Sequence, residues 1–210
     1  MEVELLHATP LEIADIAIGQ CWNTGPKDDT YEMQKRMDRV ANKNKHGSTI
    51  EHINYSFKIT GLPRFVLQEL ARHRHQSLSV KSSRYTISEL KTIHLWDADN
   101  YFNWEIIKKY IHITGNRFID DQNVKALIQM QKLLYMQLPN DKVKQAMPEA
   151  YLTDLVSTFN ARSFQHFLSL RTDKSALKEI RDLAFAMYDV IPDNHRFLFQ
   201  RYLKPRDTSN

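Results

Sequence analysis

A dense group of cationic and hydroxyl side chains lies in the fourteen residues from Arg72 to Tyr85. The segment, RHRHQSLSVKSSRY, holds three arginines, two histidines, one lysine and four serines. A guanidinium group offers a planar fork of donors that binds phosphate through parallel hydrogen bonds, and serine hydroxyls and backbone amides fill the remaining acceptor positions. This composition predicts an anion site, and a small phosphorylated ligand fits it best.

The sequence before this segment predicts the element that positions it. Pro63 followed by RFVLQELARHR is typical of a helix with proline in its first turn, because Phe65, Val66 and Leu70 recur at helical spacing. Helix propensity falls over 77–80, where serine and a β-branched residue favour an extended or turning backbone. The basic residues are therefore expected to straddle a helix C-terminus and a loop, where binding residues usually lie.

Three interpretations of the basic segment are open from its composition. A solvated basic face explains many lysine-rich runs, but here arginine and histidine dominate and alternate with serines, which solubility does not require. An arginine loop can also hold the phosphates of a nucleic acid. The third interpretation is a nucleotide or flavin site. Because GxGxxG and GxxxxGK patterns are absent, side chains would have to hold any dinucleotide.

Size, charge and cysteine content limit the class of protein. With 210 residues, 42% of them hydrophobic, the chain is long enough for one large domain. A net charge of +4 mildly favours anionic partners, but the sequence has no dense basic tail. Cys21 is the single cysteine, which excludes an internal disulfide and indicates the cytoplasm. The acidic start and the lack of a long apolar segment predict a soluble, untargeted protein.

Patterning along the chain predicts one α+β domain over 1–210, helix-rich with a small sheet. Alternation of Ile53, Tyr55, Phe57 and Ile59 indicates a half-buried strand. A short strand is expected at 2–6, the pattern over 85–95 is mixed and partly extended, and the pattern over 151–159 is ambiguous. Helices are expected at 10–22 with Thr9 as the cap, 31–44, 104–113, 121–138, 141–145, 161–170, 174–190 and 195–203.

The segment HGSTIEH, residues 46–52, also carries side chains that could bind ligands. His46 and His52 are six residues apart and do not share a helix face, which argues against a zinc site. Glu51 is better explained by a cap or a strand-edge hydrogen bond. His46 can stack or form a hydrogen bond in a cleft.

The segment NARSFQHFLSLR, residues 160–171, holds a further cationic cluster. Arg162 and His166 are four residues apart and therefore share a helix face. Arg171 ends an apolar run, where it either serves the helix C-terminus or contacts a ligand, and the capping role is the simpler one from sequence. The apolar residues of the segment are expected in the core: Phe164, Phe167, Leu168 and Leu170.

Together these clusters resemble the flavin-dependent thymidylate synthases, the ThyX family, along nearly the whole chain. The family signature is Arg-His-Arg, seven residues and then serine, which corresponds here to Arg72-His73-Arg74 and Ser82, followed by Arg84-Tyr85. The HxSxxEH element at 46–52 and the NARS…LR element at 160–171 occur in the family's order and spacing.

The resemblance implies a ThyX-like fold and the reductive methylation of dUMP to dTMP, with methylenetetrahydrofolate as carbon donor and NADPH as reductant through FAD. It also implies a homotetramer whose sites combine residues of several subunits, with no metal, nucleic acid or membrane as a partner. The alternative is an RNA- or nucleotide-binding module without catalysis. That module would need aromatic side chains for base stacking, and Tyr85 is the only obvious candidate near the basic loop.

A purely structural protein is a further alternative. It would leave four arginines unpaired near an apolar core, which is costly: Arg72, Arg74, Arg84 and Arg171.

By position, the resemblance assigns Arg171 as the catalytic residue and places His46 beside the folate or nicotinamide pocket. No histidine or aspartate base is evident near Ser82, so Ser82 is not expected to be a nucleophile. The dUMP site would comprise Glu69, Arg72, Val80, Lys81, Ser82, Ser83, Arg84, Lys144 and Arg171, with Ser82, Arg84 and Lys144 nearest the phosphate. The flavin would contact Ser48, Arg72, His73, Arg74, Val80, Asn160, Arg162 and His166.

The sequence departs from the commonest family pattern at several of these positions. Glu69 stands where many members have glutamine, and its carboxylate would repel a phosphate unless it paired with Arg72 or Lys144. The other departures are Val80 and Lys81 in place of a glutamate–leucine pair, Lys144 in place of arginine, and His166 in place of asparagine.

Overall fold

The computed structural model describes residues 1–96 and 101–206. The chain forms two compact units. Unit 1 comprises Met1–Ile59, Glu69–Ser79 and Val156–Asn210, and unit 2 comprises Thr60–Gln68 and Val80–Leu155. A single family domain over 1–210 stays a prediction.

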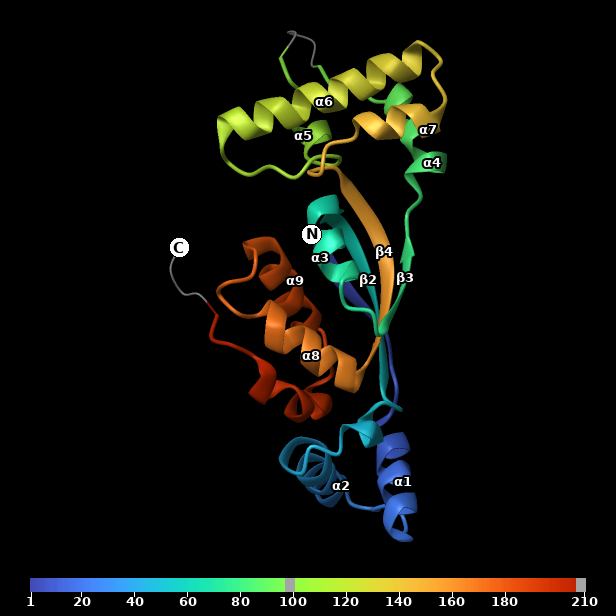
Figure 1. Cartoon of the computed structure of the whole chain (residues 1–210), viewed down its shortest axis with the longest axis vertical. Helices are drawn as coiled ribbons and strands as arrows, with labels where there is room; N and C mark the ends of the chain where they lie inside the picture. Colours follow the sequence, from blue (N-terminus) through green and yellow to red (C-terminus); the bar gives the residue numbers. More distant parts are fainter. Residues whose placement is uncertain (97–100, 207–210) are drawn as a thin grey trace. The chain divides into compact units, whose positions relative to one another are not determined.

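One antiparallel sheet has the strand order β1-β2-β4-β3 (Figure 1). The alternation expected at 53–59 is confirmed, because Tyr55, Phe57 and Ile59 are fully buried within β2. The ambiguous segment 151–159 is also a strand, since β4 pairs with a strand on either side. The strands are β1 (Glu2–Ala8), β2 (Asn54–Pro63), β3 (Gln76–Val80) and β4 (Leu152–Asn160).

Unit 1 has a core of aromatic side chains contributed by β2, β4, α8 and the C-terminal turns. Each of these rings is at most 1% exposed, and burying a ring of this size contributes about 2–3 kcal/mol. The rings are Tyr55, Phe57, Phe159, Phe164, Phe167 and Phe199. The helices of this unit are α1 (Leu11–Trp22), α2 (Thr30–Met37), α8 (Ala161–Arg171) and α9 (Lys178–Asp189), with a π-helix at Asp38–Lys43 and 3₁₀ turns at Gly47–Ile50, Asp193–Leu198 and Gln200–Tyr202.

Unit 2 is built around α6 (Arg117–Tyr135), whose buried face includes Val124, Leu127 and Leu134. In Figure 1, α7 lies beside α6, and α4 packs against α7. The short helices are α4 (Ser83–Thr86), α5 (Trp104–Ile107) and α7 (Asn140–Val143), with 3₁₀ turns at Ile87–Thr92 and Lys144–Ala146. α3 (Arg64–Ala71) contributes residues to both units.

The α+β class with a small sheet is confirmed, since 54% of the chain is helical. The segment 85–95 is helical as far as Thr92, and the backbone is extended at Ile93, so the expected mixed pattern is confirmed. Ile87 and Leu90 are both fully buried there, and a spacing of three places side chains on one face of a 3₁₀ turn. The helix expected at 104–113 ends at Ile107 because the backbone of the following residues pairs elsewhere: Leu152 N donates to Tyr110 O and His112 N donates to Ala150 O.

Four other expectations about elements need correction. Thr9 does not cap α1, because Pro10 holds that position and the Thr9 hydroxyl accepts a hydrogen bond from Asn54 N at 3.1 Å. Leu170 is 49% exposed and does not belong to the core. The segment 195–203 forms 3₁₀ turns, and α9 begins four residues later than expected.

None of the helices among residues 1–96 and 101–206 is long and apolar enough to cross a membrane.

Candidate functional site

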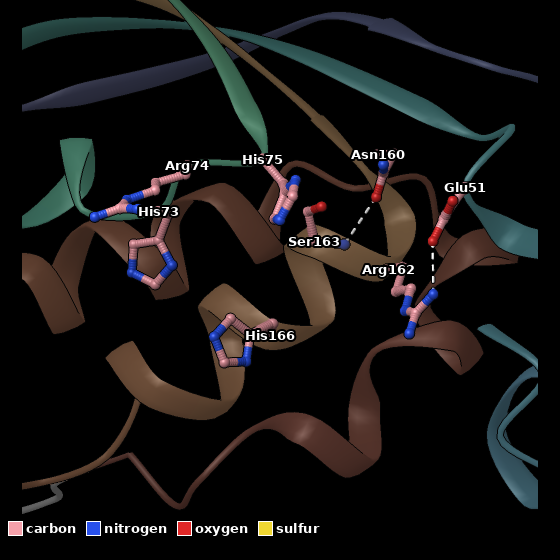
Figure 2. A pocket seen from close by; sticks show the side chains of 8 residues that line it. All are labelled: Glu51, His73, Arg74, His75, Asn160, Arg162, Ser163 and His166. Atoms are coloured by element: carbon pink, nitrogen blue, oxygen red, sulfur yellow. Dashed lines mark hydrogen bonds and ion pairs between the residues drawn. The ribbon is translucent and has the colours of Figure 1, made fainter. Parts of the chain in front are cut away.

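A cavity of about 550 Å³ lies in unit 1, and we call it the Arg162 cavity (Figure 2). Its walls come from the three sequence clusters, which are far apart in the chain and meet here. Five of the eight predicted flavin contacts line it. The lining residues are Glu51, His73, Arg74, His75, Asn160, Arg162, Ser163 and His166.

The first turn of α8 brings several of these residues to the cavity. Asn160 caps the helix, and its side-chain oxygen accepts a hydrogen bond from Ser163 N at 2.8 Å. Arg162 and His166 follow on the face that the i, i+4 spacing predicts, and both line the cavity. Because a helix N-terminus carries partial positive charge, this arrangement favours an anionic ligand.

Arg162 is held by Glu51 in an ion pair of 2.7 Å, which Figure 2 shows at one side of the cavity. The expectation that Glu51 is part of a cap is confirmed at its backbone, since Glu51 is the C-cap of the 3₁₀ turn Gly47–Ile50 and its N donates to Ser48 O at 3.2 Å. Gly47 lies against the stem of Arg162, and a Cβ atom there would be 3.1 Å from Arg162 Cδ. Glycine thus lets the segment 46–52 pass close to this arginine.

Arg171, at the end of α8, is anchored by Glu69 in the last turn of α3 and by His73 just after it. Its Nε donates to His73 Nε2 at 2.9 Å, its Nη1 to Glu69 Oε2 at 2.8 Å, and its Nη2 to the Glu69 carbonyl at 3.1 Å. That carbonyl belongs to the last turn of α3, so Arg171 serves the C-terminus of α3. Arg171 is also the basic residue in the last turn of α8, which agrees with the simpler role suggested by sequence, a cation at the C-terminus of its own helix.

These contacts fix the protonation state of His73. Its Nε2 accepts a hydrogen bond, so the ring is neutral with its proton on Nδ1. Burial lowers the pKa of His73 from 6.5 to about 4, and the positive charge of Arg171 acts in the same direction. His73 is 9% exposed and packs edge-on against Phe167. The ring therefore acts as a rigid, neutral support for the guanidinium.

Glu69 has the arginine partners that offset its charge. Glu69 Oε1 lies 3.6 Å from Arg72 Nη1, and Arg72 was one of the two partners expected from the sequence. The shorter contact of Glu69, 2.8 Å, is to Arg171. The carboxylate is thus neutralised from two sides. The side chain of Arg171 is only 15% exposed, so this pair is screened weakly by water.

Within unit 2, the structure brings the loop 80–84 to the start of α7. Arg84 Nε pairs with Asp141 Oδ1 at 2.7 Å, and the Arg84 carbonyl accepts from Asn140 Nδ2 at 2.7 Å. Lys144 follows directly after α7 and is exposed. The predicted phosphate contacts Ser82, Arg84 and Lys144 therefore belong to neighbouring elements of one unit.

The contacts of the side chains around the loop 80–84 are compatible with Ser82 as a ligand contact. Lys81 pairs with Glu89 at 3.3 Å and lies 4.0 Å from Asp154. Val80 is 37% exposed. In the part of the chain that the structure describes, no hydrogen bond involves the Ser82 hydroxyl, and no basic side chain activates it.

Three predicted flavin contacts, Ser48, Arg72 and Val80, do not line the Arg162 cavity. Sequence reasoning missed three residues that do: Glu51, which was expected to be structural, and His75 and Ser163. His75 and Ser163 lie inside the recognised motifs, directly after Arg74 and within NARS, so the motif spacing was the available signal. Outside the cavity, His46 stacks on Trp22 with ring centroids 6.2 Å apart.

The argument against a purely structural protein also needs correction. It assumed four unpaired arginines, but Arg72 and Arg171 pair with Glu69, and Arg84 pairs with Asp141. Of the four, only Arg74 lacks an ion pair within residues 1–96 and 101–206, and it lines the Arg162 cavity. In the same ranges, no three His, Cys, Asp or Glu side chains are arranged to hold a metal ion.

Cationic side chains line the Arg162 cavity, and the sequence contains neither a GxGxxG nor a GxxxxGK loop. The family model described as "Thymidylate synthase complementing protein" matches residues 4–194. The chain belongs to this family, the flavin-dependent thymidylate synthases.

Individual relatives are similar over nearly their whole length. The flavin-dependent thymidylate synthase of Wolinella succinogenes is 46% identical over 204 residues, which cover 95% of this chain and 97% of that protein. The enzyme of the same name from Campylobacter jejuni is 43% identical over 205 residues, covering 97% and 98%. The crystal structure of Thymidylate Synthase X from Helicobacter pylori with FAD and dUMP superposes with a TM-score of 0.92 at 43% identity, covering 98% of this chain and all of that one.

Proposed function

We propose that this chain converts dUMP to dTMP, with FAD as cofactor, methylenetetrahydrofolate as carbon donor and NADPH as reductant. The observation that carries the proposal is the Arg162 cavity, which unites five predicted flavin contacts from separate motifs. The Helicobacter pylori relative at 43% identity was crystallised with FAD and dUMP, which supports the same two ligands here.

The residues of the Arg162 cavity fit a flavin dinucleotide. Arg74 and Arg162 supply donors for a pyrophosphate, and Asn160 and Ser163 place the N-terminus of α8 at the cavity. His166 is exposed and can contact a flat ring system. When bound, FAD would relay the hydride from NADPH; the chain's own residues bind and orient the ligands.

We assign the dUMP phosphate to Ser82, Arg84 and Lys144. Arg84 is already oriented by Asp141, and Lys144 supplies a second cation from the adjacent element. Arg84 offers a planar fork to a phosphate, whereas Lys144 acts as a point charge, so the arginine fixes orientation and the lysine adds attraction.

Arg171 activates the uracil ring. The ring becomes a carbon nucleophile when negative charge builds on its N3–C4–O4 edge. The guanidinium has five N–H donors, and three are used by His73 and Glu69, which leaves two for the ring. Because Glu69 and His73 hold the group in place, it stabilises that charge without reorganising.

Ser82 is a ligand contact and not the nucleophile. We expect Ser82→Ala to keep measurable turnover, with an increase in the KM for dUMP, because the substitution removes one hydroxyl donor from the phosphate site. Steady-state kinetics on the FAD-loaded enzyme measure this. Complete loss of turnover with intact flavin and dUMP binding would instead assign the serine a covalent role.

The assembly is a homotetramer in the cytoplasm, without nucleic acid or membrane as a partner. Membership of the family supports this assembly, because the family resemblance implies sites that combine residues of several subunits.

The visible absorption spectrum of the FAD-reconstituted protein, titrated with dUMP, tests the proposal. A flavin band that shifts saturably with dUMP is the expected result, and uridine, which lacks the phosphate, is the control. No retained flavin, or no response to dUMP, would contradict the proposal. Binding of RNA would then be tested next, with Tyr85, which is 77% exposed, as the stacking candidate.

A further inference from the structure

A second cavity in unit 1 belongs to none of the motifs, and we call it the Trp22 cavity. It has a volume of about 520 Å³, similar to that of the Arg162 cavity. Trp22, Lys27, Arg36, Arg39 and Asn44 are among the side chains that line it, and no aspartate or glutamate does. The lining therefore carries positive charge and one indole ring.

The cavity is preformed because a buried ion pair holds its walls. Arg36 is 8% exposed, and its Nε donates to Asp15 Oδ1 at 2.7 Å. Arg36 Nη1 also donates to the Gly25 carbonyl at 3.1 Å, and Lys27 N donates to Asp15 Oδ2 at 2.8 Å. These bonds join α1, the loop after it and α2. The guanidinium of Arg36 is thus occupied by structural hydrogen bonds in the cavity wall, and Asp15 neutralises its charge.

Lys27 and Arg39 are the cations that remain available. Both are exposed, and neither forms an ion pair within residues 1–96 and 101–206. Arg39 projects from the π-helix Asp38–Lys43, which ends at Asn44. A π-helical segment departs from the regular hydrogen-bond ladder at a cost in stability and is frequently found at functional sites.

The position of Trp22 relates this cavity to the proposed reaction. Trp22 is 50% exposed and stacks on His46, with an angle of 21° between the ring planes. Under the proposed function, His46 lies beside the folate or nicotinamide pocket. A flat ligand next to His46 would therefore lie one side chain away from the Trp22 cavity, because Trp22 both contacts His46 and lines that cavity.

We propose that the Trp22 cavity binds the anionic tail of a co-substrate whose flat ring lies beside His46, with Lys27 and Arg39 neutralising its carboxylates or phosphates. This inference rests on the proposed function, since that function supplies the co-substrates. Two sources share the chemistry: the glutamate carboxylates of a folate and the 2′-phosphate of NADPH.

The test compares ligands that differ only in the tail, by calorimetric titration of the FAD-loaded protein. One arm uses tetrahydrofolate with three glutamates and with one, and the other uses NADP⁺ and NAD⁺. In one arm, we expect the wild-type protein to bind the ligand with the more anionic tail, the triglutamate or NADP⁺, roughly fivefold to tenfold more tightly than its counterpart. The arm that shows this preference identifies the co-substrate whose tail occupies the cavity. The preference should weaken as salt is raised.

The double variant Lys27→Ala/Arg39→Ala should lose this preference. The control Lys58→Ala/Arg117→Ala removes the same charge from two weak surface pairs and should keep it. The exchange Lys27→Arg/Arg39→Lys retains both charges and should also keep the preference for the more anionic tail. This variant therefore distinguishes loss of charge from loss of folding. If neither arm shows a preference, or if the double variant retains it, the inference is overturned.

The flavin response to dUMP separates this outcome from failure of the proposed function. The double variant should keep the wild-type spectral shift, because Lys27 and Arg39 do not line the Arg162 cavity. A wild-type protein without that shift would contradict the proposed function itself, whatever the result with the tails.

Discussion

Arg171 has a structural role beside the catalytic role proposed for it. Three of its N–H groups tie α8 to Glu69 of α3 and to His73, and the other two remain available for a ligand. The partner Glu69 is also a departure from the commonest family pattern. A carboxylate at this position holds the guanidinium by charge, where glutamine would hold it by a neutral hydrogen bond.

We expect Arg171→Ala to lower kcat by about a hundredfold to a thousandfold, corresponding to roughly 3–4 kcal/mol of lost transition-state stabilisation. Steady-state turnover of the FAD-loaded protein measures this loss. Arg201→Ala, which removes an exposed partner of Asp38, is the matched control and should be close to wild type. A variant at position 171 with full turnover would refute the catalytic role.

His73 predicts how stability depends on pH. Its pKa is about 4 in the folded protein and 6.5 in the reference state, so between these values the unfolded chain binds a proton that the folded chain does not. This contribution to stability is fully present above about pH 6.5 and is lost as the pH falls toward 4. Arg171, Glu69, Arg72 and His166 are the charged or titratable groups that act on His73.

Urea unfolding at pH 7 and pH 5 measures this effect. The wild-type midpoint should fall at pH 5, and it should fall less in His73→Gln, whose amide oxygen can still accept from Arg171. His7→Gln, at an exposed position, is the control and should show the wild-type dependence. Equal pH dependence in the wild type and His73→Gln would show that another group titrates.

At the scale of elements, the N-terminus of α8 combines stability with ligand binding. Asn160 caps α8, and Asn116 caps α6 in the same way, with its side-chain oxygen accepting from Phe118 N at 3.1 Å. Only Asn160 lines the Arg162 cavity. Asn116 therefore serves as a matched control for Asn160, because both cap a helix and only Asn160 lines the cavity.

We expect Asn160→Ala and Asn116→Ala each to lower the free energy of unfolding by about 1 kcal/mol, because each removes a helix cap. Only Asn160→Ala should also weaken FAD binding. Urea unfolding of the flavin-free protein and flavin titration measure the two effects separately. Equal FAD affinity in both variants would remove Asn160 from the cofactor site.

At the scale of the whole molecule, the predicted contacts for dUMP are divided between the two units. Glu69, Arg72 and Arg171 belong to unit 1, whereas the loop 80–84 and Lys144 belong to unit 2. Under the proposed homotetramer, residues of several subunits complete each site.

We expect light scattering on a sizing column to give the mass of four chains of 24.8 kDa each. Thermal unfolding should shift upward with protein concentration, because association stabilises the folded state by mass action. A monomer at micromolar concentration with full activity would show that one chain holds the complete site.

The sequence by itself determined the class of fold, the strand at 53–59 and the motifs that contain most of the site. These features depend on local periodicity and on residue types at fixed spacing, and both can be recognised in the sequence without three-dimensional information. The irregular helical segments were harder to predict from the sequence. The periodicity did not distinguish the π-helix at 38–43 or the 3₁₀ turns at 87–92 from other structure. The early end of α5 depends on backbone partners distant in the chain, such as Ala150 for His112.

Only the tertiary structure decided which side chains hold one another. Glu69 and Arg171 are 102 residues apart in sequence, and Glu51 and Arg162 are 111 residues apart. Such pairings depend on how α8 packs against the segments around it, so spacing within a motif could not reveal them. The Trp22 cavity was missed for the same reason: Asp15, Arg36 and Trp22 form no motif, and the cavity exists because a buried ion pair joins two helices.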